Sequence, residues 1–381
     1  MKHFRIFISL LVICLLFAGC HPSDVAEPPK DEQPTQQTPE APEPPVEKRV
    51  SFFGVGDNLI HNCVYWQADS NAPGSEYDFL PMYEKMRTDI ESADIAYINQ
   101  ETVLGGTEIG VSSYPMFNSP QELGRDMLDL GFDVFSLATN HAFDKGERGV
   151  ANTYAYFQEH PEATCIGMYK KGEENVKVLE KEGMKIAFVN YTFHTNGLSL
   201  PADSEYYVPV ADYKDQCAKI VADIKKADQV ADFVVCCVHW GDEGATQPNQ
   251  IQKESAQIMA DAGCDVIVGT HSHTIQPVEY IDDTLVIYSL GNFISAQNKP
   301  VNMMGGAIKF EFVLKGEEKS IENVKFEPLI NQYEGRFSNI RIIPFREYTE
   351  ALGNSHGVDV SYSYFKNLAE ETVAEEFLNL E

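Results

Sequence analysis

The sequence predicts an α/β protein built around a mostly parallel β-sheet. Short apolar strand patterns alternate with segments of helical periodicity over most of the 381-residue chain. Strands joined through helices run parallel by right-handed crossovers, and functional groups then gather at the carboxyl ends of the strands. Here one strand after another ends in histidine, carboxylate or amide side chains. The pattern therefore predicts a fold class and a position for a functional site.

Residues 1–20 have the form of an export signal. A short basic start, Met1–Arg5, leads into Ile6–Phe17, an apolar run too short to span a membrane and then stop. Ala18-Gly19 then precedes Cys20, as in bacterial lipoprotein signals, in which that cysteine becomes the lipidated first residue. We therefore expect a protein that is lipid-anchored at Cys20 on the extracytoplasmic face of the cell membrane. Secretion without lipid and an uncleaved anchor are the alternatives.

Residues 21–48 are predicted to be a disordered Pro/Glu-rich tether. They hold Pro, Glu, Gln and Thr with almost no aliphatic side chain, so they cannot bury enough apolar surface to offset the entropy of ordering. The rest is long enough for a large core. We divide it into a main domain, residues 49–315, and residues 316–381, whose strands and helix complete that domain or are appended to it.

The charge of the chain excludes one class of partner. The formal net charge is −29, whereas nucleic-acid binding requires clustered Lys and Arg. The same charge opposes broad adhesion to anionic lipid or polymer, so an anionic substrate can bind only where local cations overcome it. We expect mostly buried free thiols at the six cysteines beyond Cys20, because neither their spacing nor the chain length calls for disulfides. They are Cys63, Cys165, Cys217, Cys236, Cys237 and Cys264.

The first half of the body gives three strands with helices between them. The predicted strands are residues 49–55, 94–98 and 133–138. Helical spacing covers residues 78–92 and 149–159, and another helix begins at the capping-box sequence Ser119-Pro120 and stops at Gly131. Each strand is followed at once by polar side chains.

In the second half of the body, strands again alternate with helices, and an antiparallel pair of strands follows. Predicted strands are residues 185–191 and 232–238, the apolar runs that begin at Asp265 and Thr284, and the antiparallel pair 307–314 and 321–327. Helices are predicted over residues 211–228 and 249–262, the latter ended by Gly263, and over about the last fifteen residues.

The strand ends supply a coherent set of metal-type side chains. These are Asp57 and His61, Asn99 and Glu101, Asn140 and His141, His239 and Glu243, and His271 and His273. His271 and His273 are two residues apart, so in an extended or turning backbone both imidazoles face one side. Carboxylate, imidazole and amide oxygen suit divalent Mn, Fe or Zn, and the lack of cysteine argues against structural zinc. Two such ions would polarise a phosphoryl oxygen and supply a nucleophile.

Simpler interpretations exist for several of these residues. Asp57 and Asn140 can each cap a following helix. Trp240 and Tyr288 fit core or pocket-wall positions, and the turn at Ser289 lacks the Gly-x-Ser-x-Gly elbow of a catalytic serine. A lone strand-end histidine, His194, is a candidate pocket residue.

Taken together, the motifs resemble those of a known family. The series is Gly56-Asp57, Asn99-x-Glu101, Thr139-Asn140-His141-Ala142-x-Asp144-x-Gly146, His239-Trp240-Gly241-x-Glu243, Gly269-x-His271-x-His273 and Tyr288-Ser289-Leu290-Gly291-Asn292-Phe293. It is similar, in this order, to the motif series of the poly-γ-glutamate capsule biosynthesis family (CapA-like, PGA-cap), which is related to the calcineurin-like metallophosphatases.

The resemblance implies a four-layer α/β/β/α sandwich with a dinuclear metal site between two sheets. It implies that Asp57 and His273 hold the first metal, that Glu101 bridges, and that Asn140, His239 and His271 hold the second. It also implies that His141 is a general acid or orients the substrate, with Asp144 and Glu243 supporting catalysis. The metallophosphatases have an Asp-x-His opening, and here it is Asp57-Asn58-Leu59-Ile60-His61. This departure leaves open whether His61 reaches the first metal.

These inferences give two candidate functions. One is a membrane-anchored hydrolase, with two-ion chemistry of the phosphoesterase type, that cleaves a phosphoester or amide-like bond in capsule synthesis or export. Its substrate would be an anionic polymer or a phosphoester. The other is a non-catalytic accessory or binding subunit of a polymer synthase or export complex, which keeps the fold without turnover. Membrane polymer-synthase subunits are expected partners in either case.

Overall fold

The computed structural model describes residues 46–72, 76–215 and 217–381. Pro45–Glu381 form one compact unit. The predicted export signal, Cys20 and nearly all of the predicted tether lie outside the described residues. Within the described ranges, no helix is both long and apolar enough to cross a membrane.

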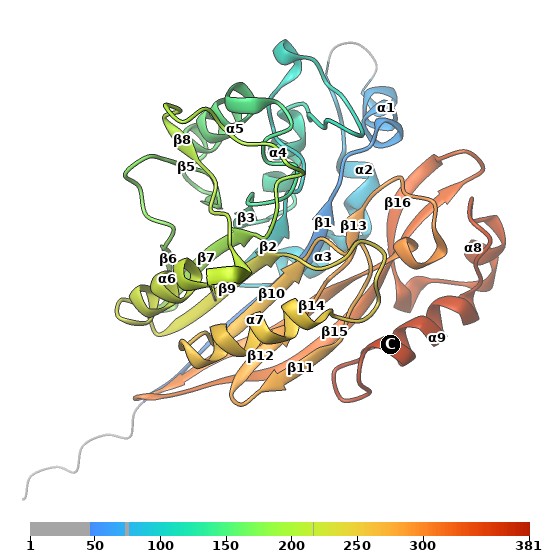
Figure 1. Cartoon of the computed structure of the whole chain (residues 1–381). Coiled ribbons are helices and arrows are strands. Elements are labelled where there is room, and N and C mark those ends of the chain that lie inside the picture. The colour runs from blue at the N-terminus through green and yellow to red at the C-terminus, as the bar shows by residue number, and fades with distance from the viewer. Residues whose placement is uncertain (1–45, 73–75, 216) are drawn as a thin grey trace, which may run out of the picture. The chain divides into compact units, whose positions relative to one another are not determined.

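Two mixed β-sheets organise this unit (Figure 1). The eight-stranded sheet has the order β16-β15-β14-β1-β2-β3-β4, with β13 beside β1; the six-stranded sheet has the order β11-β12-β10-β9-β7-β6. The first comprises β1 (Glu47–Asn58), β2 (Ile95–Asn99), β3 (Val134–Ser136), β4 (Thr164–Ile166), β13 (Asn292–Ile294), β14 (Met304–Lys315), β15 (Glu318–Glu334) and β16 (Ser338–Pro344). The second comprises β6 (Lys177–Lys181), β7 (Met184–Thr192), β9 (Phe233–His239), β10 (Val266–Thr270), β11 (Val278–Ile281) and β12 (Thr284–Ile287). A short pair, β5 (Tyr169–Lys170) and β8 (Tyr206–Tyr207), lies apart from both.

Each sheet has a parallel centre with antiparallel additions. β1, β2, β3 and β4 pair in parallel, as do β7, β9, β10 and β12. The antiparallel strands β14 to β16 extend the first sheet, while β6 and β11 form the edges of the second. The carboxyl ends of β1 and β2, and of β9 and β10, therefore each lie side by side.

Helices cover the outer faces of the sheets. They are α1 (Asn62–Asn71), α2 (Leu80–Tyr83), α3 (Arg87–Glu91), α4 (Glu122–Asp129), α5 (Gly146–Glu159), α6 (Ala218–Asp228), α7 (Gln250–Asp261), α8 (Glu350–Ser355) and α9 (Tyr362–Thr372). Single 3-10 turns are η1 (Glu84–Met86), η2 (Thr107–Ile109), η3 (Tyr213–Asp215), η4 (Pro300–Met303) and η5 (Phe345–Glu347). Figure 1 shows α6 and α7 together on one face of the six-stranded sheet.

Alternation along β9 shows how the layers form. Phe233 points toward the other sheet, where its ring centroid lies 5.0 Å from that of Phe312 on β14. Its neighbour Val234 faces the opposite way and packs in a separate apolar cluster with Ile220 of α6 and Met259 of α7. Because successive side chains alternate, a strand this apolar must be covered on both faces. With Phe157 of α5 against the far side of the first sheet, the predicted four-layer α/β fold is confirmed.

The carboxyl-terminal part of the chain belongs to the first sheet. β14 pairs with β1 from Glu47↔Lys315 to Val55↔Ala307, and β15 and β16 follow in the same sheet. The helix predicted over the last residues is displaced: α9 ends at Thr372, and the amide of Asn379 instead donates to the carbonyl of Phe326 on β15. The predicted helix over residues 78–92 is broken into α2, η1 and α3.

The cysteines of the described unit are free thiols. Cys217, Cys236, Cys237 and Cys264 are buried, and Cys63 and Cys165 are partly buried.

Candidate metal centre

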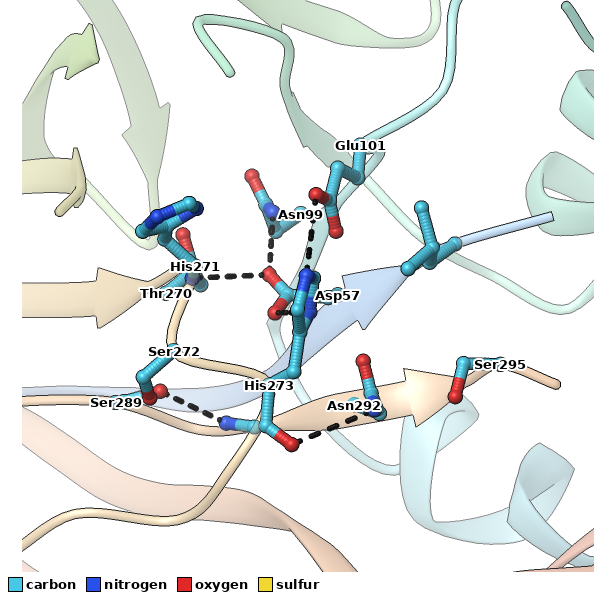
Figure 2. A network of polar contacts seen from close by, with 12 residues as sticks. Asp57, Asn99, Glu101, Thr270, His271, Ser272, His273, Ser289, Asn292 and Ser295 are labelled. Carbon is cyan, nitrogen blue, oxygen red and sulfur yellow. Dashed lines mark hydrogen bonds and ion pairs between the residues drawn. The ribbon is translucent and has the colours of Figure 1, made fainter. Parts of the chain in front are cut away.

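The strand ends predicted to carry functional groups meet where the two sheets approach each other. The amide of Asp57, at the end of β1, donates to the carbonyl of Gly291 at 2.8 Å. The amide of His271, just beyond β10, donates to Asp57 Oδ1 at 3.3 Å, which links the sheets directly (Figure 2). A Cβ atom at Gly56 would lie 1.9 Å from the same Gly291 carbonyl oxygen. Glycine at position 56 is therefore a condition for this close approach.

One group of three side chains consists of Asp57, Glu101 and His273, whose candidate ligand atoms all lie within 4.8 Å of one another. His273 Nδ1 is 3.0 Å from Asp57 Oδ2, and His273 Nε2 is 3.8 Å from Glu101 Oε1 (Figure 2). Burial opposes a charge on His273, but the carboxylates of Glu101 and Asp57 outweigh it and raise the pKa of His273 to about 9.

The second group consists of Glu101, His239 and His271, again within 4.8 Å. His271 Nδ1 lies 3.1 Å from His239 Nε2, and Asn140 Oδ1 lies 2.9 Å from the same nitrogen, so the amide joins this group. Burial, reinforced by the neighbouring histidines, lowers the pKa of both His239 and His271 well below the usual value. Both rings are therefore neutral and have a lone pair to offer.

Glu101 is the member common to both groups. Its side chain is fully buried. Neither carboxylate oxygen has a hydrogen-bond partner among the described residues. Burial accordingly raises the pKa of Glu101 well above its usual value. A buried carboxylate without partners is costly, and a cation between the two groups would remove that cost. The residues present therefore fit divalent metal ions at both groups.

Further side chains hold the ligand candidates in place. Asn99 Nδ2 donates to Asp57 Oδ1 at 2.8 Å, and Asn99 Oδ1 accepts from Ser136 Oγ at 3.1 Å, which fixes the amide orientation. His194 Nε2 lies 2.8 Å from His271 Nε2, so the lone strand-end histidine contacts the site. His271 and His273 have φ values of +93° and +56°, a backbone that non-glycine residues rarely adopt away from functional turns.

His141 and Asp144 form a separate dyad. His141 Nδ1 donates to Asp144 Oδ2 at 2.7 Å, and that oxygen also accepts the amide of Phe117 at 2.6 Å. A carboxylate only accepts, so Nδ1 carries a proton and the reactive nitrogen of His141 is Nε2. The Phe117 ring packs edge-on against His141.

The structure leaves two predicted site residues outside both the ligand groups and the His141–Asp144 dyad. His61 Nδ1 lies 3.2 Å from the amide of Ala296 and is not part of either group. Glu243 is exposed, and it acts on the site only through its charge, which contributes to the raised pKa values of Glu101 and His273.

Sequence reasoning missed Phe117, Ala296 and Asn302. Asn302 Nδ2 donates to the His273 carbonyl at 2.9 Å and so supports the turn that carries this histidine. These residues come from loops and η4, where no periodic pattern marks them. A proline two residues before Phe117 was the nearest local signal.

Comparison with known proteins decides the family. Residues 51–297 match the family model described as bacterial capsule synthesis protein PGA_cap. The chain belongs to this family. The resemblance seen in the motif series is thereby confirmed, and the matched range contains every member of both ligand groups.

Two curated relatives have similar names. The chain is 33% identical over 181 residues to the PGA biosynthesis protein CapA of Bacillus subtilis (strain 168), covering 44% of each protein. It is 31% identical over 186 residues to the capsule biosynthesis protein CapA of Bacillus anthracis, covering 47% of this chain and 44% of the relative. The matches thus span less than half the length of these relatives.

Solved structures with a partly similar arrangement include two named enzymes. One is a novel phosphatase from Mycoplasma pneumoniae, with a TM-score of 0.44, 11% identity, and coverage of 75% of this chain and 95% of the other. The other is a 5'-nucleotidase precursor from Thermus thermophilus, with a TM-score of 0.39, 12% identity, and coverage of 84% of this chain and 57% of the other.

Proposed function

We propose that this member of the capsule synthesis family is a metal-dependent hydrolase, lipid-anchored on the extracytoplasmic face of the cell membrane, that acts on a capsule polymer or its precursor. The observation that carries the proposal is Glu101. A fully buried carboxylate lies between two sets of neutral or paired ligand side chains, and neither of its oxygens has a hydrogen-bond partner among the described residues. Because Glu101 belongs to both groups, its carboxylate would help to hold a cation at either one.

The chain supplies two sets of ligands for divalent Mn, Fe or Zn. Asp57, Glu101 and His273 would hold one ion, and Glu101, Asn140, His239 and His271 would hold the other. When bound, the ions would polarise the scissile group and supply a strong nucleophile at neutral pH.

The protein's own side chains then orient substrate and move a proton. Because Asp144 keeps the proton of His141 on Nδ1, proton transfer takes place at Nε2, where a protonated ring can serve the leaving group. Asn99 keeps Asp57 in one rotamer by donating to Oδ1. The backbone of the His271–His273 turn is held by Asn302. These contacts fix the reactive groups before substrate arrives.

The substrate class follows from family and charge. The relatives' names concern capsule and PGA biosynthesis, and a phosphoester or an amide-like bond of an anionic polymer is the corresponding target. With a net charge of −29 the protein surface repels such a chain, so productive contact is confined to the metal centre or assisted by a membrane synthase partner.

Metal analysis of the purified protein tests this function. We expect close to two equivalents of Mn, Fe or Zn per chain, with the metal largely lost in His271→Ala and His273→Ala. The control His160→Ala removes a partly exposed histidine that pairs with Glu162; it should keep wild-type metal.

Turnover of a generic phosphodiester should follow metal content across these variants. A wild-type protein that binds no metal would refute the proposed function. Stoichiometric metal without turnover of phosphodiester or γ-glutamyl amide substrates would instead identify the accessory subunit.

A further inference from the structure

His61 lies beside the metal centre without joining it. It follows β1 by three residues and immediately precedes α1. Its ring packs edge-on against Phe117, with centroids 5.2 Å apart, and Phe117 in turn packs edge-on against His141 at 4.7 Å. The side chains of His61, Phe117 and His141 therefore form a continuous row that ends at the His141–Asp144 dyad.

The hydrogen bonds of His61 determine which ring nitrogen carries the proton. Two backbone groups reach Nδ1: the amide of Ala296 at 3.2 Å and the carbonyl of Leu59 at 3.3 Å. The Leu59 carbonyl already accepts the amide of His61 at 3.1 Å. In the described part of the chain, the Ala296 amide has Nδ1 as its one recorded acceptor. Since backbone amides inside proteins are almost always paired, Nδ1 accepts and the neutral ring carries its proton on Nε2.

This tautomer excludes one role and permits another. A protonated ring nitrogen has no lone pair to give to a metal, and the lone pair of Nδ1 is used by Ala296. His61 therefore offers its surroundings a single N–H donor.

We propose that His61 Nε2–H binds an anionic oxygen of the substrate on the side of the His141–Asp144 dyad and is not a metal ligand. This inference rests on the proposed function and adds a substrate-binding residue to it. Phosphoryl and carboxylate oxygens only accept hydrogen bonds, so they match a fixed donor. A neutral donor also suits a site that is already crowded with histidines, because it attracts the anion without adding a repelling charge to the metal ions.

Two substitutions test whether His61 is a hydrogen-bond donor to the substrate or a metal ligand. His61→Gln keeps an N–H near the position of Nε2, whereas His61→Phe keeps the edge contact with Phe117 and removes the donor. In metal-loaded protein, we expect both variants to keep wild-type metal content by elemental analysis. Calorimetric titration should show that His61→Phe weakens the binding of inorganic phosphate about tenfold to a hundredfold and that His61→Gln weakens it less than about fivefold.

The same titrations with glutarate in place of phosphate distinguish the two sources of the anionic oxygen. A loss confined to phosphate assigns a phosphoryl oxygen to His61, and a loss confined to glutarate assigns a carboxylate oxygen. If either variant loses metal as His273→Ala does, or if both variants bind both probes as the wild type does, the proposal is wrong.

A measurement on the unsubstituted protein removes dependence on how the variants fold. Long-range ¹H–¹⁵N correlation spectra of histidine-labelled protein, with His61 assigned by comparison with His61→Gln, should show the ring protonated on Nε2. Protonation on Nδ1 would overturn the inference. This readout does not require metal, so it stays informative even if metal analysis refutes the proposed function.

Discussion

Replacing Glu101 by glutamine should have opposite effects on the stability of the protein without metal and with metal. In metal-free protein, the substitution removes a buried carboxylate whose two oxygens have no hydrogen-bond partner among the described residues. The cost of leaving such a group unsatisfied is about 1–3 kcal/mol. We therefore expect Glu101→Gln in the presence of chelator to be as stable as the wild type or more stable, by up to about 2 kcal/mol.

With metal present, the wild type should be more stable than Glu101→Gln. A ligand at a hundred to a thousand times its Kd stabilises the folded state by about 2.7–4.1 kcal/mol. For a domain of this size that corresponds to a rise in Tm of roughly 4–6 °C. The wild type should gain this increase on addition of Mn²⁺ or Zn²⁺, and Glu101→Gln should gain little because it lacks the carboxylate common to both groups.

Thermal unfolding followed by fluorescence, with chelator and with each metal, measures both effects. Glu243→Gln is the matched control, since it removes an exposed carboxylate that follows β9 and belongs to neither ligand group. This control should keep the full metal-induced rise in Tm. A Glu101→Gln protein that is destabilised in chelator yet keeps the full metal-induced rise would refute the assignment of Glu101 as the bridge.

Three further predictions concern other parts of the chain. In the folded protein the pKa of His273 is raised from 6.5 to about 9, so its protonation stabilises metal-free protein fully below pH 6.5. This contribution to stability is lost as pH rises through about 9. Unfolding measured in chelator should show the loss, and His273→Gln should make stability less dependent on pH in this range. Gly56→Ala should lower stability by about 1–3 kcal/mol or more, because its Cβ would lie 1.9 Å from the Gly291 carbonyl oxygen; an unchanged Tm would contradict the close approach of the strands. Cys20→Ser should release the protein from membranes in cell fractionation, and retention of the variant would argue against lipidation.

The ligand groups could be foreseen because they follow from topology. A parallel pairing places the ends of adjacent strands side by side, so Asp57 and Asn99 are register partners, and so are His239 and Thr270. Apolar runs of this kind are visible in the sequence, and so is the polar residue that ends each of them. The sequence of a strand end does not show in which direction its side chain points. His61 is an example, because the amide of Ala296, which is distant in sequence, donates to Nδ1 of its ring.

Other elements were missed because their local signals are weak. α1 has only Val64 and Ala68 buried, so no apolar stripe marks it as a helix. β15 extends well beyond the predicted segment, to Glu334, because pairing with β14 and β16 on its two sides sets its length. The contact of Phe117 with the His141–Asp144 dyad depends on the fold of a loop, which periodicity does not indicate.

The direction of β1 has a mechanical consequence. This strand begins at Glu47 and ends at Asn58, one residue after the candidate ligand Asp57. A load between an anchor before β1 and a polymer held at the centre would therefore run along the strand. Its hydrogen bonds to β14 and β2 lie across that line and would share the load as a shear, rather than opening one pair after another. With the proposed anchor in place, the strand that carries the candidate ligand Asp57 would thus also be the one that bears tension.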